Sequence, residues 1–200
     1  MAKSMCAHNL VKPSAESLMA SAQAASKKGL PPVHLWNPPF CGDLDMKIAR
    51  DGTWFYQGTP IGRQKMVKLF STILRKDGND YFLVTPVEKV GITVEDAPFL
   101  AVDFSVTNSG PAQILTFRTS LGDEVEAGPE APIRVEIDPA GQPSPYVLIR
   151  SNLEALIDRK SFYRLVELGE IQTQDGQDWF GVQSHGAFFS IIEAEALQAL

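Results

Sequence analysis

The chain has 200 residues, of which 44% are apolar, and it carries a formal net charge of −6. This composition is sufficient for a sizeable core and excludes disordered and fibrous proteins. Residues 98–200 carry six basic against fifteen acidic side chains, which argues against binding to duplex DNA or to a membrane surface, because both need a broad positive surface.

The sequence predicts a protein of the cytoplasm. No stretch approaches the roughly 20 apolar residues of a membrane-spanning helix, and residues 1–30 lack the continuous apolar run of a signal peptide. The two cysteines, Cys6 and Cys41, are too few for a disulfide framework, and two free thiols fit the same compartment.

The first elements in chain order are a helix and a proline-rich loop. Residues 14–28 are rich in alanine and serine, which favours a helix that Ser14 and Ser17 cap together. Its apolar pattern is weak, so we expect a peripheral helix or a mobile arm. The following segment contains four prolines, which prevent regular structure and hold the chain extended around Trp36 and Phe40.

A hairpin and a second helix follow the loop. Apolar and polar residues alternate over residues 44–48, Asp51-Gly52 forms a turn, and residues 53–57 return as the second strand. Apolar residues at helical spacing then predict a helix over residues 62–75. The basic residues on its solvated face are Lys65, Lys68, Arg75 and Lys76.

Residues 77–84, DGNDYFLV, have a counterpart in residues 175–182, DGQDWFGV. Each segment follows a predicted helix, the second of which runs from Asn152 to Leu168, and each leads into an aromatic strand. The same order of strand, turn, strand, helix and Asp-Gly turn in both halves predicts an internal duplication. Further strands are expected at residues 88–94, 99–106, 113–119, 133–137 and 146–150 and at the C-terminal AFFSII.

The predicted fold class is α+β, with two β-rich domains related by duplication and one main helix in each. A chain of this length suits one large domain or two small ones. The expected boundaries are residues 1–29 for an N-terminal arm or peripheral helix, 30–97 for the first domain and 98–200 for the second.

Long stretches of the sequence resemble the bacterial domain-of-unknown-function 1285 family. They run from PPVHLWNPPFCGD to TPVEKVGI and include SFYRLVELGE and DWFGVQSHGAFF, so the resemblance covers nearly everything beyond residue 29. It implies a two-domain, internally duplicated structure whose second domain is superficially similar to pleckstrin-homology folds. The role suggested for the family is binding of a nucleotide-like ligand between the domains, in signalling, and no activity is established for it.

Patterns that carry catalysis are mostly absent from the sequence. It has no glycine-rich phosphate loop, no nucleophile elbow and no histidine or cysteine cluster with metal spacing, so we expect no metal and no cofactor. Cys41 with His34 could form a thiolate–imidazole pair, and Asp43 with Asp45 could act as acid and base. We prefer the alternatives, in which Cys41 fills space beside Phe40 and the two aspartates face solvent.

The candidate ligand-binding residues come from the loop, the first hairpin, the helix start and the second half. Proline rigidity presents Trp36 as an aromatic wall next to Asn37, although Trp36 can equally plug the core. Arg63 lies at the helix start, where its guanidinium and free backbone N–H groups could hold a phosphate. The full set is Trp36, Asn37, Asp43, Trp54, Tyr56, Arg63, Arg150 and Arg164.

Four of these residues have an alternative interpretation. Trp54 and Tyr56 lie at alternate strand positions and face either the core or a groove. Arg150 and Arg164 occupy positions in the second half that are loosely comparable to that of Arg63. Many carboxylates lie near them in the sequence, so either arginine could form an ion pair instead.

We expect a non-enzymatic ligand-binding or regulatory protein that holds a small anionic molecule between its two units, because interfaces between domains favour pockets. A hydrolase that uses Asp43, His34 or Cys41 is the first alternative. The second alternative is a protein-interaction module that binds a polypeptide through strand edges or an aromatic surface. The sequence does not identify such a protein partner.

Overall fold

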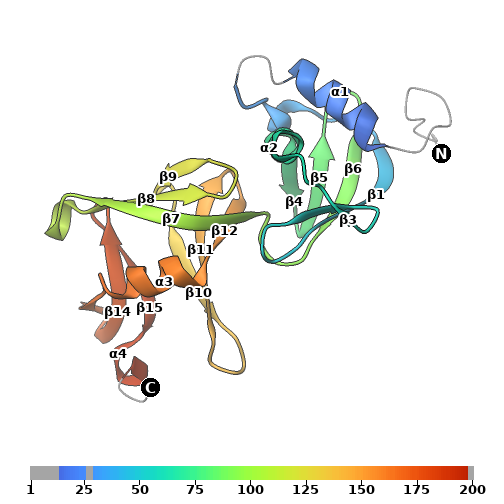
Figure 1. Cartoon of the computed structure of the whole chain (residues 1–200). Coiled ribbons are helices and arrows are strands. Elements are labelled where there is room, and N and C mark those ends of the chain that lie inside the picture. The colour runs from blue at the N-terminus through green and yellow to red at the C-terminus, as the bar shows by residue number, and fades with distance from the viewer. Residues whose placement is uncertain (1–13, 26–28, 198–200) are drawn as a thin grey trace. The chain divides into compact units, whose positions relative to one another are not determined.

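The structure is a computed structural model that describes residues 14–25 and 29–197. The chain divides into two compact units, of which the first ends at Asp96 and the second begins at Ala97 (Figure 1). Among the described residues, no helix is long and apolar enough to cross a membrane. The beginning of the expected N-terminal arm, residues 1–13, lies outside the described residues.

Helix α1 (Ala15–Ala25) begins with the reciprocal cap that the sequence predicts. The Ser17 N–H donates to Oγ of Ser14 at 3.2 Å, and the Ser14 N–H donates to Oγ of Ser17 at 3.4 Å. Leu18 is fully buried, and α1 contacts helix α2 (Gln64–Thr72). The N-terminal helix is therefore packed on the first unit.

A six-stranded sheet forms the body of the first unit, in the order β3-β2-β1-β6-β5-β4. Two antiparallel groups of three strands meet at its centre, where β1 and β6 run parallel. The short helix η1 (Val33–Leu35) precedes the sheet, and α2 connects the two groups. The strands are β1 (Phe40–Ile48), β2 (Trp54–Tyr56), β3 (Thr59–Pro60), β4 (Leu74–Asp77), β5 (Asp80–Val84) and β6 (Lys89–Val94).

An aromatic pair joins the sheet to helix α2 in the core of the first unit. Trp54 of β2 is 2% exposed and stacks on Phe70 of α2, with 6.4 Å between the ring centroids. The predicted Asp51-Gly52 turn brings β2 back along β1, and Gly52 has the positive φ, 80°, that glycine adopts without strain. Large aromatic side chains dominate the energy of such cores, so this contact fixes α2 on the sheet.

The second unit contains another six-stranded sheet, in the order β10-β11-β12-β7-β8-β9. Two antiparallel groups of three strands again meet at a parallel pair, which here is β7 and β12. The elements are β7 (Phe99–Thr107), η2 (Gly110–Ala112), β8 (Ile114–Thr119), β9 (Glu124–Glu126), β10 (Ile133–Ile137), β11 (Pro143–Arg150) and β12 (Leu153–Ile157).

A separate three-stranded antiparallel sheet, β13-β14-β15, completes the second unit. Ser184 of β14 ties it to the larger sheet, because its Oγ accepts from the Leu115 N–H at 2.9 Å and donates to the Ala127 carbonyl at 2.6 Å. Helix α3 contacts both β7 and β14 (Figure 1). These elements are α3 (Arg159–Val166), β13 (Glu170–Gln174), β14 (Gln177–Ser184), β15 (Ala187–Glu193) and the short α4 (Ala194–Leu197).

The two large sheets have the same topology, which agrees with the predicted duplication of β-rich units. In each sheet the first strand in the chain runs parallel to the sixth, and the order of the remaining strands is the same. The two segments of the sequence repeat, however, do not lie at equivalent positions of the two large sheets. Residues 77–84 form the β4–β5 hairpin of a large sheet, whereas residues 175–182 lie at the β13–β14 hairpin of the small one. Each hairpin follows a helix, as predicted, but the counterpart of β4–β6 in the large sheet is β10–β12.

The first predicted helix is shorter than expected. The prediction covered residues 62–75, whereas α2 ends at Thr72, and Arg75 and Lys76 belong to strand β4. Leu74 and Leu83 pair across β4 and β5 and are both buried. Strand pairing therefore replaces the helix in a segment where the helical spacing of apolar residues continues.

The second predicted helix is a strand followed by a helix. Leu153 to Ile157 form β12, in which alternate side chains are buried, as expected of a strand with one covered face. Asp158, rather than Asn152, caps α3, and its Oδ1 accepts from the Ser161 N–H at 2.7 Å. An aspartate that accepts from the third helical residue is a preferred N-cap.

Candidate ligand-binding site

The first large sheet carries a hollow of about 430 Å³ on three neighbouring strands, β1, β6 and β5. Phe82 and Gly91 lie directly opposite each other on β5 and β6, and they alternate along their strands with the fully buried Leu83 and Val90. Because successive side chains of a strand point to opposite faces, the hollow lies on the face of the sheet away from the core.

Gly91 forms the floor of this hollow. A Cβ atom at position 91 would collide with Oδ1 of Asp43 and would lie 3.8 Å from Cε2 of Phe40. The missing side chain therefore lets the Asp43 carboxylate lie over strand β6. Phe40, which is 53% exposed, and Phe82 form an aromatic wall, with 6.1 Å between the centroids of their edge-to-face rings.

Asp77 of β4 joins two cations beside the hollow. Its Oδ2 lies 2.8 Å from Nη2 of Arg75 and 2.7 Å from Nζ of Lys89. Nζ of Lys89 also lies over the Phe82 ring, 3.8 Å from its centroid. Partial burial raises the pKa of Asp77, but the hydrogen bonds and charges of Arg75 and Lys89 outweigh it and hold the pKa below its ordinary value.

The same network fastens the proline-rich loop. Nη1 of Arg75 donates to the carbonyl of Val33 at 3.1 Å and to that of Trp36 at 2.7 Å. The guanidinium is thus bonded to Asp77 on one side and to the loop on the other, and the Arg75 side chain is only 15% exposed. The loop that leads into Phe40 is therefore held by a residue of the sheet.

The equivalent strands of the second large sheet carry a similar charge cluster. Arg134 is ion-paired with Glu136 and with Glu154, whose Oε1 lies 2.5 Å from Nε of Arg134. Its guanidinium also lies over the Tyr146 ring, 4.2 Å from the centroid. Here a cation bridges two carboxylates, so the net charge is opposite to that of the first cluster. By strand pairing, Arg134, Glu136, Tyr146 and Glu154 correspond to Arg75, Asp77, Phe82 and Lys89.

The two sheets differ at the position of the hollow. Leu156 lies opposite Tyr146 as Gly91 lies opposite Phe82. The neighbour of Leu156 on the parallel strand is Leu100, whereas the neighbour of Gly91 is Asp43. Two leucines thus stand where the first sheet has a glycine and a carboxylate, so the duplicated surfaces have diverged at this site.

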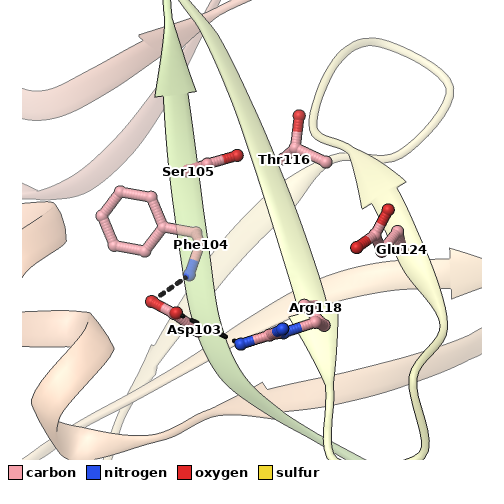
Figure 2. A pocket seen from close by; sticks show the side chains of 6 residues that line it. All are labelled: Asp103, Phe104, Ser105, Thr116, Arg118 and Glu124. Atoms are coloured by element: carbon pink, nitrogen blue, oxygen red, sulfur yellow. Dashed lines mark hydrogen bonds and ion pairs between the residues drawn. The ribbon is translucent and has the colours of Figure 1, made fainter.

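A smaller hollow of about 240 Å³ lies on β7, β8 and β9 in the second unit (Figure 2). Figure 2 shows Arg118 pointing toward Asp103, and the distance from Nη2 to Oδ2 is 3.4 Å. The other carboxylate oxygen of Asp103 lies 2.5 Å from Nη1 of Arg164. Hydrogen bonds from Arg164 and from the Phe104 N–H lower the pKa of Asp103. The central carboxylate of this hollow is therefore already neutralised by arginine.

Comparison with known proteins identifies the family of the chain. The N-terminal domain model of the domain of unknown function DUF1285 matches residues 31–97, and the C-terminal domain model matches residues 98–191. The chain belongs to the DUF1285 family. None of the curated proteins compared with it matches.

Two crystal structures of DUF1285 proteins are similar to this chain. The DUF1285 family protein from Silicibacter pomeroyi DSS-3, at 2.50 Å resolution, is 60% identical with a TM-score of 0.82, and the match covers 90% of this chain and 97% of that one. The DUF1285 family protein from Shewanella baltica OS155, at 1.40 Å resolution, is 32% identical with a TM-score of 0.49, and the match covers 62% of this chain and 91% of that one.

The structure of this DUF1285 protein brings only part of the predicted site together. Asp43 lines the first hollow. Trp36 is half-buried and Asn37 is exposed in the loop that Arg75 fastens. Arg63 is exposed at the N-cap of α2. None of these last three residues lines the hollow.

Trp54 is a core residue, which corrects its assignment to the ligand site. Its ring is stacked on Phe70 and is 2% exposed, so a ligand at the surface cannot use it as a wall. Tyr56, two residues further along β2, is half-buried. Because residues two apart on a strand share a face, Tyr56 lies on the same face of β2 as Trp54.

The two arginines predicted in the second unit form ion pairs. Nη1 of Arg150 lies 3.2 Å from Oδ1 of Asp123, and its guanidinium lies over the Phe99 ring. Burial lowers the pKa of Arg150, although Asp123 opposes this effect. Arg164 binds Asp103 and also donates to the Phe104 carbonyl at 3.0 Å. The alternative that the sequence left open, pairing with nearby carboxylates, applies to both.

The structure also places the residues of the alternative enzyme, Cys41, His34, Asp43 and Asp45. Cys41 is disulfide-bonded, which corrects the expectation of a free thiol and removes its thiolate as a nucleophile. His34 is exposed in η1, and Asp43 and Asp45 are exposed on β1. Among the described residues, no group of three or more His, Cys, Asp and Glu side chains is placed to hold a metal ion.

Sequence reasoning missed Phe82, Lys89 and Gly91. Phe82 belongs to the repeated DGNDYFLV segment, which drew attention to this hairpin but was interpreted only as a sign of duplication. Lys89 and Gly91 lie in an ordinary strand sequence and give no signal by themselves. They come next to Asp43 because β6 pairs with β1 over a separation of almost fifty residues.

Proposed function

We propose that this DUF1285 protein is a non-enzymatic ligand-binding protein with a regulatory role, and that a small, partly planar molecule binds in the first hollow. The observation that carries the proposal is the pairing of Gly91 with an exposed aromatic wall. An exposed phenylalanine, Phe40, stands beside a glycine floor in a hollow whose lining combines aromatic with charged side chains. Concave sites that combine aromatic surface with a few polar groups are the usual form of small-molecule sites.

The comparison of the two large sheets supports the same proposal. The charge cluster and its aromatic partner recur in both sheets, which indicates that this part of the surface is structural. The opening at Gly91 and the carboxylate of Asp43 differ from their counterparts, Leu156 and Leu100. Lys89, which also lines the hollow, likewise differs in charge from its counterpart Glu154. Differences among the residues that line a hollow are expected where one copy of a duplicated sheet acquires a binding function.

A second proposal keeps the ligand that the sequence predicts, a small anionic, nucleotide-like molecule. Its support is the exposure of Arg63 at the start of α2 and of Asn37 in the loop. Screening nucleotides by thermal shift tests it, and Arg63→Ala should abolish any stabilisation. A role in signalling rests on the resemblance to the family, which also implies the pleckstrin-homology-like second domain.

A cytoplasmic location also remains a proposal. The disulfide at Cys41 argues against a cytoplasmic location, because thiols are kept reduced in the cytoplasm. Labelling of Cys41 by a thiol reagent in freshly lysed cells decides the matter. A labelled Cys41 supports the cytoplasm, and protection that disappears on reduction contradicts it.

The test of the first proposal is a screen of small planar fragments against the full chain by ligand-observed NMR. Gly91→Leu fills the hollow with the residue found at the equivalent position of the second sheet, and it needs only a movement of the flexible Asp43 side chain. Thr93→Leu adds the same bulk at an exposed position of the same strand, outside the lining of the hollow.

Fragments that bind in the hollow should lose binding in Gly91→Leu and retain it in Thr93→Leu. Thermal unfolding of both variants without ligand shows that they fold. If every fragment that binds the parent protein binds Gly91→Leu equally well, the hollow is not the ligand site. Turnover of a fragment or of a chromogenic ester that is lost in Asp43→Asn would favour the alternative enzyme.

A further inference from the structure

The charges that line the first hollow are not equally available to a ligand. Of the described residues that line it, Lys89 is the only cation, and its ammonium already binds Asp77 at 2.7 Å and lies over the Phe82 ring. Asp43 and Asp80 also line the hollow and are exposed. Among the described residues, neither of these carboxylates has a hydrogen-bond or ion-pair partner through its side chain. The charge left for a ligand is therefore negative.

The aromatic wall favours the same sign of ligand charge. A ring face attracts cations through its quadrupole, and the Phe82 ring already holds the ammonium of Lys89 at 3.8 Å. The neighbouring Phe40 ring meets Phe82 edge to face and is 53% exposed. A flat cation can lie against Phe40 while its N–H groups reach the Asp43 carboxylate, which lies over Gly91.

We propose that the first hollow binds an organic cation, a flat amidinium, guanidinium or ring-bearing ammonium group that stacks on Phe40 and donates hydrogen bonds to Asp43 and Asp80. This inference rests on the proposed function, since it names the ligand class of the same hollow. Planar N–H forks match carboxylates in two-bond geometry, and the aromatic wall selects an organic cation over a bare metal ion. For this hollow it replaces the anionic ligand expected from the sequence, because Lys89 already binds Asp77 and two further carboxylates line the hollow.

The probes are three molecules of the same shape and different charge: benzamidine, benzamide and benzoate. Binding to the full chain is measured by ligand-observed NMR titration at low salt. Benzamidine should bind most tightly, benzamide more weakly and benzoate least. Hydrogen bonds to a charged group are the stronger ones, so each of Asp43→Asn and Asp80→Asn should weaken benzamidine binding by at least about tenfold.

Two further variants make the test specific. Asp45→Asn removes an exposed carboxylate from the same strand outside the hollow and should leave benzamidine binding within about twofold, since surface charges are screened by salt. Lys89→Gln removes a like charge and uncovers the Phe82 ring, so it should tighten benzamidine binding. Gly91→Leu should abolish it.

The outcomes separate this inference from the proposed function. Equal or tighter binding of benzoate, lost in Gly91→Leu, overturns the inference and leaves the hollow as a ligand site. Benzamidine binding that survives Gly91→Leu, or that falls as much in Asp45→Asn as in Asp43→Asn, also overturns it. If none of the three probes binds, the inference fails, and the fragment screen alone decides whether the hollow binds other ligands.

Discussion

Replacing Asp77 with alanine should destabilise the first unit by about 2 kcal/mol. The change leaves Arg75 and Lys89, whose side chains are 15% and 20% exposed, without the carboxylate that bridges them. Removing one partner from a charged hydrogen bond costs about 1.5–3 kcal/mol when the groups are buried and about 0.2–1 kcal/mol when they are exposed. Asp77 is 38% exposed, so two bonds of intermediate strength together give the expected value.

The effect of Asp77 should also depend on pH. Its folded-state pKa lies below its ordinary value, because the bonds from Arg75 and Lys89 outweigh the opposing effect of burial. The stabilisation is therefore present above about pH 4, the ordinary pKa of aspartate, and is lost as the pH falls through the folded-state pKa. The difference in stability between the parent protein and Asp77→Ala should shrink correspondingly below about pH 4.

The assay is urea unfolding of the full chain followed by tryptophan fluorescence, to which the buried Trp54 contributes, together with thermal unfolding followed by calorimetry. The matched control is Glu136→Ala, which removes the corresponding carboxylate of the second sheet. Glu136 is 63% exposed, and Arg134 keeps its pair with Glu154, so this variant should lose less than about 0.5 kcal/mol. A loss for Asp77→Ala no larger than that of Glu136→Ala would refute the role of Asp77 as the centre of the network.

Three other substitutions test the fold, each by urea unfolding of the full chain. Trp54→Ala should cost about 3–5 kcal/mol, because a buried ring leaves a cavity next to Phe70, and a cost below about 1 kcal/mol would contradict its place in the core. Ser184→Ala should cost about 2 kcal/mol, because the Leu115 N–H and the Ala127 carbonyl lose their partner, whereas the exposed Ser190→Ala should be nearly neutral. Asp158→Ala should cost about 1 kcal/mol through loss of the α3 cap, and an unchanged midpoint would show that Asp158 does not cap the helix.

Local sequence was sufficient for the elements that depend on neighbouring residues. The Ser14–Ser17 cap and the Asp51-Gly52 turn are formed as predicted, because both need only side chains and backbone within a few residues of each other. The two β-rich units also follow from the pattern of alternation. The family could be identified from long stretches of matching sequence and is confirmed by the two domain models.

The sequence misled where two patterns competed. The apolar residues around Ile73 fit a helix, and those of residues 153–157 also fitted one, but both segments enter strands. In each case the decision came from pairing with another strand, that of β4 with β5 in the adjoining hairpin and that of β12 with the distant β7. Helical spacing and strand alternation agree for short apolar runs, so burial against a partner strand decides between them.

The hollow depended entirely on tertiary structure. Asp43 could be singled out in the sequence, but Gly91 and Phe82 become its neighbours only when β6 inserts between β1 and β5. The charge available to a ligand could likewise not be predicted from composition, because it depends on which cations bind Asp77 and which carboxylates have no partner. Sequence determines local geometry through contacts a few residues apart, whereas a site of this kind requires strands far apart in the chain to pair in one register, and only the folded sheet sets that register.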